Sequence, residues 1–319
     1  MMNIESIHYS CGDDFCNSQT PISHAFSNWN FIETLSKATG YKNISVTIEV
    51  NGGEYIIPLL ERKALGLYPI AFSLPFGLYG GISSYHTIVE NRFRELIASA
   101  KQYLRMDIVI QNPFLEKELF KANMTIIHRA YAHIIHTDKH SYDELFRSVY
   151  EYKIRKNLKR AKDSGLKIIS GNDEKIMSDY YSLYILSSKR WGQSRPKYSL
   201  DFFHKFLNAP YFQVKIVLYE NVPVAGLVIL KFESQIFCWF GAMNKEYSNM
   251  RSNDFLYDNV IHEAIDAKIP IVNFGSSGKL EGVRKFKESL GAEEIKYNIY
   301  FVGNPLVAKG LSWLMNRNG

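Results

Sequence analysis

The stretch "QVKIVLYENVPVAGLVILKFESQIFCWFGAM", residues 213–243, decides the fold of the second half of this sequence. Three runs rich in β-branched and aromatic residues are separated by two short polar turns, a pattern that predicts a three-stranded antiparallel meander. Residues 253–268 then repeat their apolar side chains at helical spacing, and the apolar run 269–275 predicts a buried strand. The order of three strands, a helix and a strand predicts an α+β unit.

The first half of the sequence repeats this order. Two β-rich runs flank the turn Asn51-Gly52-Gly53, which predicts a hairpin. Residues 70–81 begin as a short strand and break into a loop at their glycines. A helix is expected within residues 89–105, and a buried strand over residues 106–111. The sequence therefore predicts two α+β units of similar design.

We expect the two domains to span residues 1–140 and 141–302. The remaining residues, 303–319, read as a short amphipathic helix with Leu306, Leu311 and Leu314 on one face. We expect this helix to pack back on the body of the protein.

Composition narrows the class of protein. With 319 residues and 46% hydrophobic content the chain is globular, and no apolar run reaches the roughly 18 residues that span a bilayer. The N-terminus lacks the pattern of a secretory signal. The three cysteines form no CxxC pair, which indicates reduced thiols. We expect the protein to lie in the cytoplasm. If its substrate is linked to a lipid, we expect it at the inner membrane surface.

No metal site is expected from the histidines or cysteines. In a strand, His128 and His136 share one face and His133 the other, which is poor geometry for a cluster. Cys11 and Cys16 with His8 lack a fourth ligand.

The positive charge is local. The net charge is +6, and residues 153–162 carry six cations and no acid. Apolar side chains at Ile154, Leu158 and Ala161 give this segment one inward helical face. A solvated basic helix is the simpler interpretation, but the mutual repulsion of its cations favours an anionic partner.

A second basic segment, "VNFGSSGKLEGVRKFKESLG" at residues 272–291, runs from a strand through glycines into a helix. Gly275 and Gly278 permit positive φ and expose backbone N–H groups. Together with a helix N-terminus, Arg284 and Lys287, they are able to hold an anion or a developing oxyanion. The spacing fits neither GxGxxG nor a P-loop.

The order "FGSS" then "GxxxFKxxxG", at residues 274–277 and 282–291, resembles the FemAB-like peptidyl- and aminoacyl-transferases of the GNAT superfamily. Other segments agree in the same order along nearly the whole chain: "SLPFGLYGG" at 73–81, "YAHIIHT" at 131–137, "YKIRKNLKRAKDSGLKI" at 152–168 and "YSLYILSSKRWG" at 181–192. The resemblance implies an α+β fold of tandem GNAT-like domains, each a mixed, mainly antiparallel sheet flanked by helices.

The resemblance also implies an enzyme that moves an aminoacyl or acyl group onto an amine of a phosphate-bearing cell-envelope or related precursor. Phe286 and Lys287 would lie at the transfer site, where the lysine stabilises negative charge on the reacting carbonyl. The residues expected to bind substrate are Arg155, Lys156, Lys159, Arg190, Trp191, Tyr79, Gly80, Gly275, Ser276, Gly282 and Arg284.

The chain departs from the superfamily where coenzyme A would bind. A CoA-dependent GNAT domain needs the pattern Q/R-x-x-G-x-G/A, whereas residues 247–259 contain no glycine, and Asp254 would compete for the helix N-terminus. The departure favours aminoacyl-tRNA over acyl-CoA as the donor, with no resident cofactor. The expected partners are a small-molecule or lipid-linked precursor and charged tRNA. Asp254 and Glu281 are candidate general bases by position.

Two alternatives stay open. One is an N-acyltransferase that uses acyl-CoA or acyl carrier protein. The other is a non-catalytic module that binds an anionic polymer through its basic helix, with strongly salt-dependent affinity. The sequence leaves the acyl group, the acceptor and the oligomeric state open.

Overall fold

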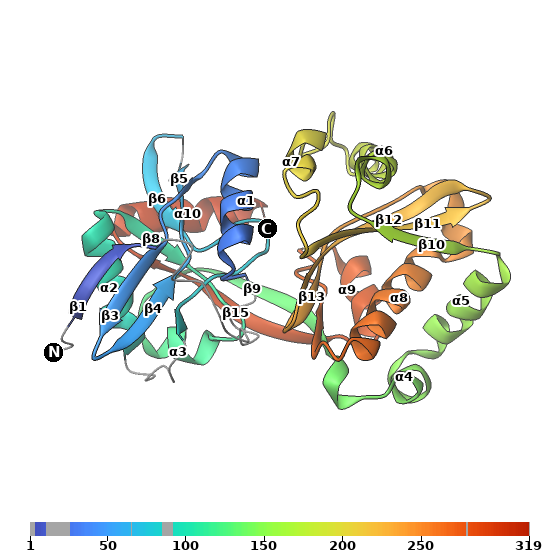
Figure 1. The fold of residues 1–319 in the computed structure, drawn as a ribbon, viewed down its shortest axis with the longest axis horizontal. Coiled ribbons are helices and arrows are strands. Elements are labelled where there is room, and N and C mark those ends of the chain that lie inside the picture. Colours follow the sequence, from blue (N-terminus) through green and yellow to red (C-terminus); the bar gives the residue numbers. More distant parts are fainter. Residues whose placement is uncertain (1–3, 11–25, 65, 85–91, 279, 319) are drawn as a thin grey trace. The chain divides into compact units, whose positions relative to one another are not determined.

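The computed structural model describes residues 4–10, 26–64, 66–84, 92–278 and 280–318. The chain forms two compact units, Met1–Ala132 together with Ile295–Gly319, and His133–Glu294 (Figure 1). The sequence placed the second boundary at residue 302. The strand after Glu294 instead belongs with the first unit, because its Tyr300 pairs with Ile110. The cysteines at positions 11 and 16 lie outside the described residues.

The second unit contains the predicted meander and its crossover. Strands β10 (Lys167–Gly171), β11 (Phe212–Tyr219), β12 (Val222–Phe232) and β13 (Gln235–Met243) are antiparallel neighbours in that order. Strand β14 (Ile271–Asn273) runs parallel to β13, and its other edge pairs with the end of β9 (Thr125–His136). This arrangement confirms the predicted order of three strands, a helix and a strand.

Helices cover both faces of this sheet (Figure 1). Helices α5 (Tyr152–Asp163) and α8 (Ser252–Asp266) contribute apolar side chains to one core, and α6 (Glu174–Arg190) packs on the other face. Helix α9 (Glu281–Ser289) follows β14. The short elements of the unit are η4 (Thr137–Lys139), α4 (Tyr142–Glu144), η5 (Leu145–Val149), α7 (Leu200–His204) and η6 (Lys245–Met250).

The first unit has two sheets. The predicted hairpin forms β3 (Val46–Val50) and β4 (Gly53–Ile57), which lie in a sheet with β1 (Ile4–Tyr9) and β7 (Ser83–Ser84). The other sheet contains β15 (Glu293–Val302), β8 (Asp107–Ile110), β6 (Tyr68–Phe72), β5 (Leu60–Ala64) and β2 (Lys42–Asn43). Its helices are α1 (Trp29–Thr39), α2 (Phe93–Leu104), α3 (Glu116–Lys121) and α10 (Pro305–Asn318).

The two units share one structural device. In each, a helix connects two neighbouring parallel strands, α2 between β6 and β8 and α8 between β13 and β14. In the first unit, polar side chains fill the space where the pairing of β6 with β8 ends. Gln111 Nε2 donates to the carbonyls of Leu74 and Leu78 at 3.2 and 2.9 Å, and the side-chain amide of Asn112 donates to the carbonyl of Gly80. The equivalent space in the second unit is hollow.

Helix α10 packs on the first unit, where Ala308 and Leu311 join a core with Ile70, Phe72 and Val109. Within the described ranges, every helix is too short or too polar to traverse a lipid bilayer.

Candidate active site

The candidate site begins where β13 and β14 separate. The two strands pair only at Ile236–Val272 and Phe237–Asn273. Beyond this point β14 ends, because Gly275 adopts a φ of +63° and its N–H donates to the Asn273 side chain at 2.9 Å. An Asx turn with a left-handed glycine directs the chain away from the sheet. Strand β13 continues to Met243, so the two strands diverge and leave a hollow between them.

A β-bulge lies on β13 beside this hollow. Val228 pairs with Phe240 and Ile229 with Cys238, so Trp239 is the extra residue. A bulge bends the strand and takes a backbone group out of the ladder, and bulges are frequent next to active sites.

The hollow is a cavity of about 290 Å³. Strand β13 supplies Cys238 and Trp239 to its wall, the loop after β14 supplies Ser276 and Ser277, α9 supplies Phe286 and Lys287, and the end of α6 supplies Arg190 and Trp191. Segments far apart in the sequence thus meet around one small space.

Lys287 places its ammonium group inside the protein. The side chain is 4% exposed, and Nζ donates to the carbonyls of Gly275 and Ser276 at 3.0 and 2.9 Å. An ammonium has three N–H bonds, so these two carbonyls leave one donor for a ligand in the cavity. Burial lowers the pKa of Lys287 to about 8, with a small opposing effect from Cys238. At neutral pH the group is therefore mostly protonated.

An aromatic wall stands beside Lys287. The rings of Phe286 and Tyr257 meet edge to face with centroids 5.2 Å apart, and Phe274 contacts Tyr257 at 5.5 Å. Burial raises the pKa of Tyr257, so its hydroxyl stays protonated. A side chain at Gly241 would approach the Tyr257 oxygen to 3.0 Å, so this glycine allows the close packing of helix α8 on β13.

Two further side chains offer polar groups to the cavity wall. Ser277 is 5% exposed, and within the described part of the chain its hydroxyl has no hydrogen-bond partner, which leaves it available to a ligand. Cys238 is buried, and burial raises the pKa of its thiol, which disfavours a thiolate nucleophile.

The rim of the cavity is partly exposed. Helix α6 ends at Arg190, whose guanidinium carbon lies 5.9 Å from the centroid of the Trp191 ring. Trp191 is 46% exposed. A cation stacked on an exposed indole is suited to a planar or anionic substrate group.

The structure thus brings together Phe286, Lys287, Gly275, Ser276, Arg190 and Trp191 from the predicted set. Sequence reasoning missed Ser277, Cys238, Tyr257 and the bulge at Trp239. "QIFCWFGAM" has the composition of an ordinary core strand, and no local signal marks the bulge or the cavity.

The other predicted residues of the second unit lie elsewhere. Gly282 lines a separate cavity of about 610 Å³ between α5, α8 and α9. Arg284 lies beside Glu288 and Glu294 at 3.6 and 4.0 Å. Arg155 donates to the carbonyls of residues 147 and 150, while Lys156 and Lys159 are exposed on α5.

Tyr79 and Gly80 belong to the first unit and are buried there. Tyr79 packs against Phe26 and Phe114 with ring centroids 4.7 and 5.4 Å apart, and the Gly80 N–H donates to Ser73. These contacts give the loop a structural role within its own unit.

The start of helix α8 carries a buried acid. Asp254 lies in the first turn, is 8% exposed and accepts a hydrogen bond from the Asn157 amide at 3.1 Å. Burial raises its pKa, although the bond from Asn157 and the charge of Arg251 oppose the shift. A carboxylate at this helix terminus repels a pyrophosphate, so the local chemistry fits poorly to the phosphates of coenzyme A.

His133 in β9, Glu288 and Glu294 place one potential ligand atom each within 4.8 Å of one another. The prediction of no metal rested on the spacing of the histidines and on the missing fourth ligand for the cysteines, and it did not anticipate this group. Arg284 already contacts both carboxylates, which offsets the charge that would attract a cation.

Comparison with known proteins adds a family model and several solved structures. Residues 147–288 match the model of an acetyltransferase (GNAT) domain. No curated protein shows significant similarity to this sequence.

Similarity to the solved structures extends over nearly the whole chain at low identity. FemX is 13% identical, with a TM-score of 0.73 over 94% of this chain and 98% of that one. The C-terminal domain of a putative lysylphosphatidylglycerol synthetase from Agrobacterium fabrum is 12% identical, with a TM-score of 0.62 over 96% and 94%. L-PGS from Bacillus licheniformis is 12% identical, with a TM-score of 0.56 over 93% and 99%. At these identities the comparison establishes a shared fold.

Proposed function

We propose that this chain, whose residues 147–288 match an acetyltransferase (GNAT) domain model and whose fold is similar to that of FemX, moves an aminoacyl group from an ester donor onto an amine of a phosphate-bearing cell-envelope precursor. The observation that carries the proposal is the third N–H of the buried Lys287 ammonium, which is left for a ligand in the cavity where β13 and β14 diverge. The names of two similar structures, lysylphosphatidylglycerol synthetase and L-PGS, support aminoacyl transfer.

The chemistry follows from the position of Lys287. The acceptor amine attacks the ester carbonyl, a C–N bond forms, and the carbonyl oxygen gains negative charge. The ester C–O bond then breaks, and the proton lost by the amine ends on the departing hydroxyl. A positioned ammonium in a buried site stabilises the charge that develops on the oxygen. Since an ester is already activated, positioning together with this stabilisation accounts for much of the rate.

Asp254 and the absence of glycine at the start of α8 favour an aminoacyl ester over acyl-CoA as donor. The family model describes an acetyltransferase domain, so acyl-CoA is the alternative donor to be tested. Both donors present a carbonyl to Lys287. They differ in the group that carries the acyl chain, which is a tRNA in one case and coenzyme A in the other.

A thermal-shift titration tests the proposed acceptor and the alternative donor. We expect a UDP-linked sugar-peptide to raise the melting temperature by several degrees, because a ligand at about 100 times its Kd stabilises by about 2.7 kcal/mol. Coenzyme A and acyl-CoA should leave the melting temperature unchanged. A shift with acyl-CoA would overturn the inference from Asp254 and establish the acyl-CoA alternative.

The pH dependence of turnover tests the protonation state of Lys287. Its pKa of about 8 means that the ammonium is lost as the pH rises through 8. We expect the ratio of wild-type kcat/KM to that of Lys287→Met to fall about tenfold per pH unit above that value, because only the ammonium donates to the oxyanion. Taking the ratio cancels the titration of the acceptor amine. A ratio that instead rises above pH 8 would identify Lys287 as a general base.

A further inference from the structure

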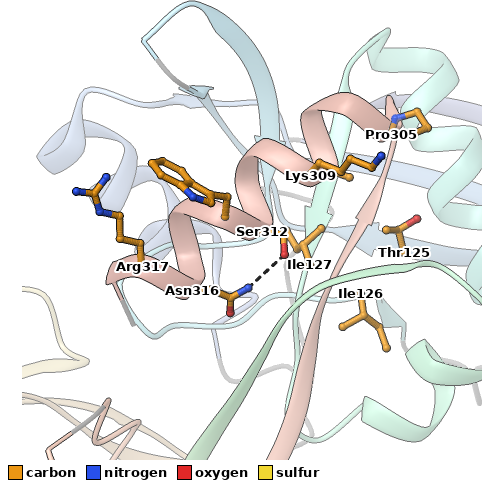
Figure 2. A pocket seen from close by; sticks show the side chains of 10 residues that line it. Thr125, Ile126, Ile127, Pro305, Lys309, Ser312, Asn316 and Arg317 are labelled. Carbon is orange, nitrogen blue, oxygen red and sulfur yellow. Dashed lines mark hydrogen bonds between the residues drawn. The ribbon is translucent and has the colours of Figure 1, made fainter.

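Helix α10 and the start of β9 form a groove on the first unit. The groove is a cavity of about 690 Å³, and Figure 2 shows Ile126 and Ile127 of β9 opposite Ser312 and Asn316 of α10. The Asn316 amide donates to Ser312 at 3.3 Å, and its oxygen lies 2.8 Å from Nδ1 of His128 in β9. The bond to Ser312 lies within the helix, and the contact with His128 holds the outer part of α10 beside the strand.

The outward face of α10 alternates apolar and cationic side chains. Leu306, Lys309, Trp313 and Arg317 follow one another at i, i+3, i+7 and i+11, and all four are exposed. Leu306 is 75% and Trp313 59% exposed. The opposite face, with Ala308 and Leu311, is buried in the core of the unit. The apolar residues of the outward stripe are therefore not required for the packing of the helix.

The exposed apolar surface continues beyond the helix. Ile126 lines the groove and also a neighbouring cavity that contains Phe120 and Arg129. Phe120 is 62% and Ile126 40% exposed. A contiguous patch of this kind, in contrast to scattered single residues, marks an interaction surface.

The groove itself is lined by cations and by no acid, whereas the neighbouring cavity also contains Glu116, which accepts hydrogen bonds from Asn298 and Tyr300. No acidic residue occurs in residues 295–319 or in residues 119–137, the two segments that supply α10 and β9. Lys309, Arg317 and Arg129 are exposed cations in these segments. The Arg317 guanidinium lies 5.2 Å from the centre of the Trp313 ring, which keeps a cation next to the indole. The surface therefore complements an anionic partner.

We propose that this groove and the outward stripe of α10 dock on the surface of an anionic lipid bilayer. A helix that lies in the membrane interface places leucine and tryptophan at the acyl boundary and its lysine and arginine among the headgroups. RNA is the other anionic partner that aromatic and basic residues fit. The exposed Leu306, Ile126 and Phe120 favour lipid, because phosphates and riboses would leave these side chains against polar groups.

Vesicle sedimentation with the full chain tests the docking surface. We expect binding to phosphatidylcholine vesicles that contain about one third phosphatidylglycerol, and little binding to pure phosphatidylcholine, at about 0.1 M salt. Lys309→Glu with Arg317→Glu should weaken binding at least tenfold. Its matched control, Lys63→Glu with Arg105→Glu, reverses two exposed cations of the same unit outside the groove and should retain more of the affinity.

The apolar contribution needs its own pair of variants. Leu306→Ser with Trp313→Ser should also weaken vesicle binding about tenfold or more, because the double variant removes the apolar area that the bilayer would bury. Leu67→Ser, at a side chain 86% exposed on a turn of the same unit, should leave binding unchanged. Wild-type protein that ignores anionic vesicles, or a serine pair that binds them normally, would overturn the proposal. Retention of tRNA with no vesicle binding would assign the surface to RNA.

Discussion

Replacing Lys287 by methionine is expected to reduce the rate of aminoacyl transfer by about 100- to 1,000-fold, the usual effect of removing one preorganised donor to an oxyanion. Methionine keeps the length and the apolar stem of the side chain and removes only the ammonium. The loss should appear in kcat, because the third N–H of Lys287 strengthens its bond only as the carbonyl oxygen becomes charged.

Folding stability should change much less than turnover. The ordinary pKa of lysine is 10.5 and that of Lys287 is about 8, so the unfolded chain binds this proton more tightly. Below pH 8 the buried charge therefore costs about 3 kcal/mol of folding free energy, and the cost disappears as the pH rises from 8 to 10.5. Methionine removes this cost but leaves the carbonyls of Gly275 and Ser276 without their donor, a loss of similar size.

Lys285→Met provides the matched control. Lys285 lies on the same helix, is 68% exposed and pairs with Glu281 at 2.9 Å. Both variants lose one cation from α9, and only Lys287 faces the cavity. Single-turnover transfer from charged tRNA and chemical denaturation measure the two effects separately. Turnover within a few-fold of wild type in Lys287→Met would remove the lysine from the mechanism.

Gly291→Ala is expected to lower the free energy of unfolding by about 3 kcal/mol or more. Gly291 ends α9 with a φ of +82°, and an added Cβ would lie 2.1 Å from Cγ1 of Val149. The conformation alone costs an alanine about 1 kcal/mol. Most of the expected loss comes from the clash, because the branched Val149 side chain has little freedom to move aside.

Two further variants isolate the clash. Gly165 has a similar φ of +71°, and a Cβ added there would meet no atom within 4 Å, so Gly165→Ala measures the conformational cost alone. Val149→Ala combined with Gly291→Ala removes the blocking methyl group and should recover part of the stability. Urea denaturation of the set gives the comparison. Equal losses for Gly291→Ala and Gly165→Ala would show that the α9 terminus relaxes freely.

Much of the second unit follows from local sequence. The alternation of residues 213–243 specifies three strands, and the helical spacing of residues 253–268 specifies α8. In both cases the apolar side chains recur at the period that places them on one face of the element, where they pack against a core. The glycines at 275 and 278 mark the left-handed turns that the structure contains. The resemblance to FemAB-like transferases singled out Phe286 and Lys287, and in the structure Lys287 donates to the carbonyl of Gly275. Their role in transfer stays a prediction.

The partners of charged side chains did not follow from the sequence. Arg155 and Arg284 belong to conspicuously basic segments, but Arg155 bonds backbone carbonyls and Arg284 lies beside two glutamates. A long cationic side chain reaches acceptors on several neighbouring elements, and only their packing decides which one it meets. The surroundings of Tyr79 also did not follow from the sequence, because the glycine-rich loop that was expected to bind substrate is held inside its unit by Gln111 and Asn112.

The sequence by itself determined the elements, their order and the presence of a lysine beside a glycine turn, since these depend on residues close together in the chain. Only the tertiary structure decided that β13 and β14 diverge after two paired residues and that Trp239 forms a bulge in β13. It also decided that Cys238, Tyr257 and Ser277 face the same cavity as Lys287. A cavity is defined by the surfaces of segments that are distant in sequence. Its position is therefore fixed by how those segments pack against one another.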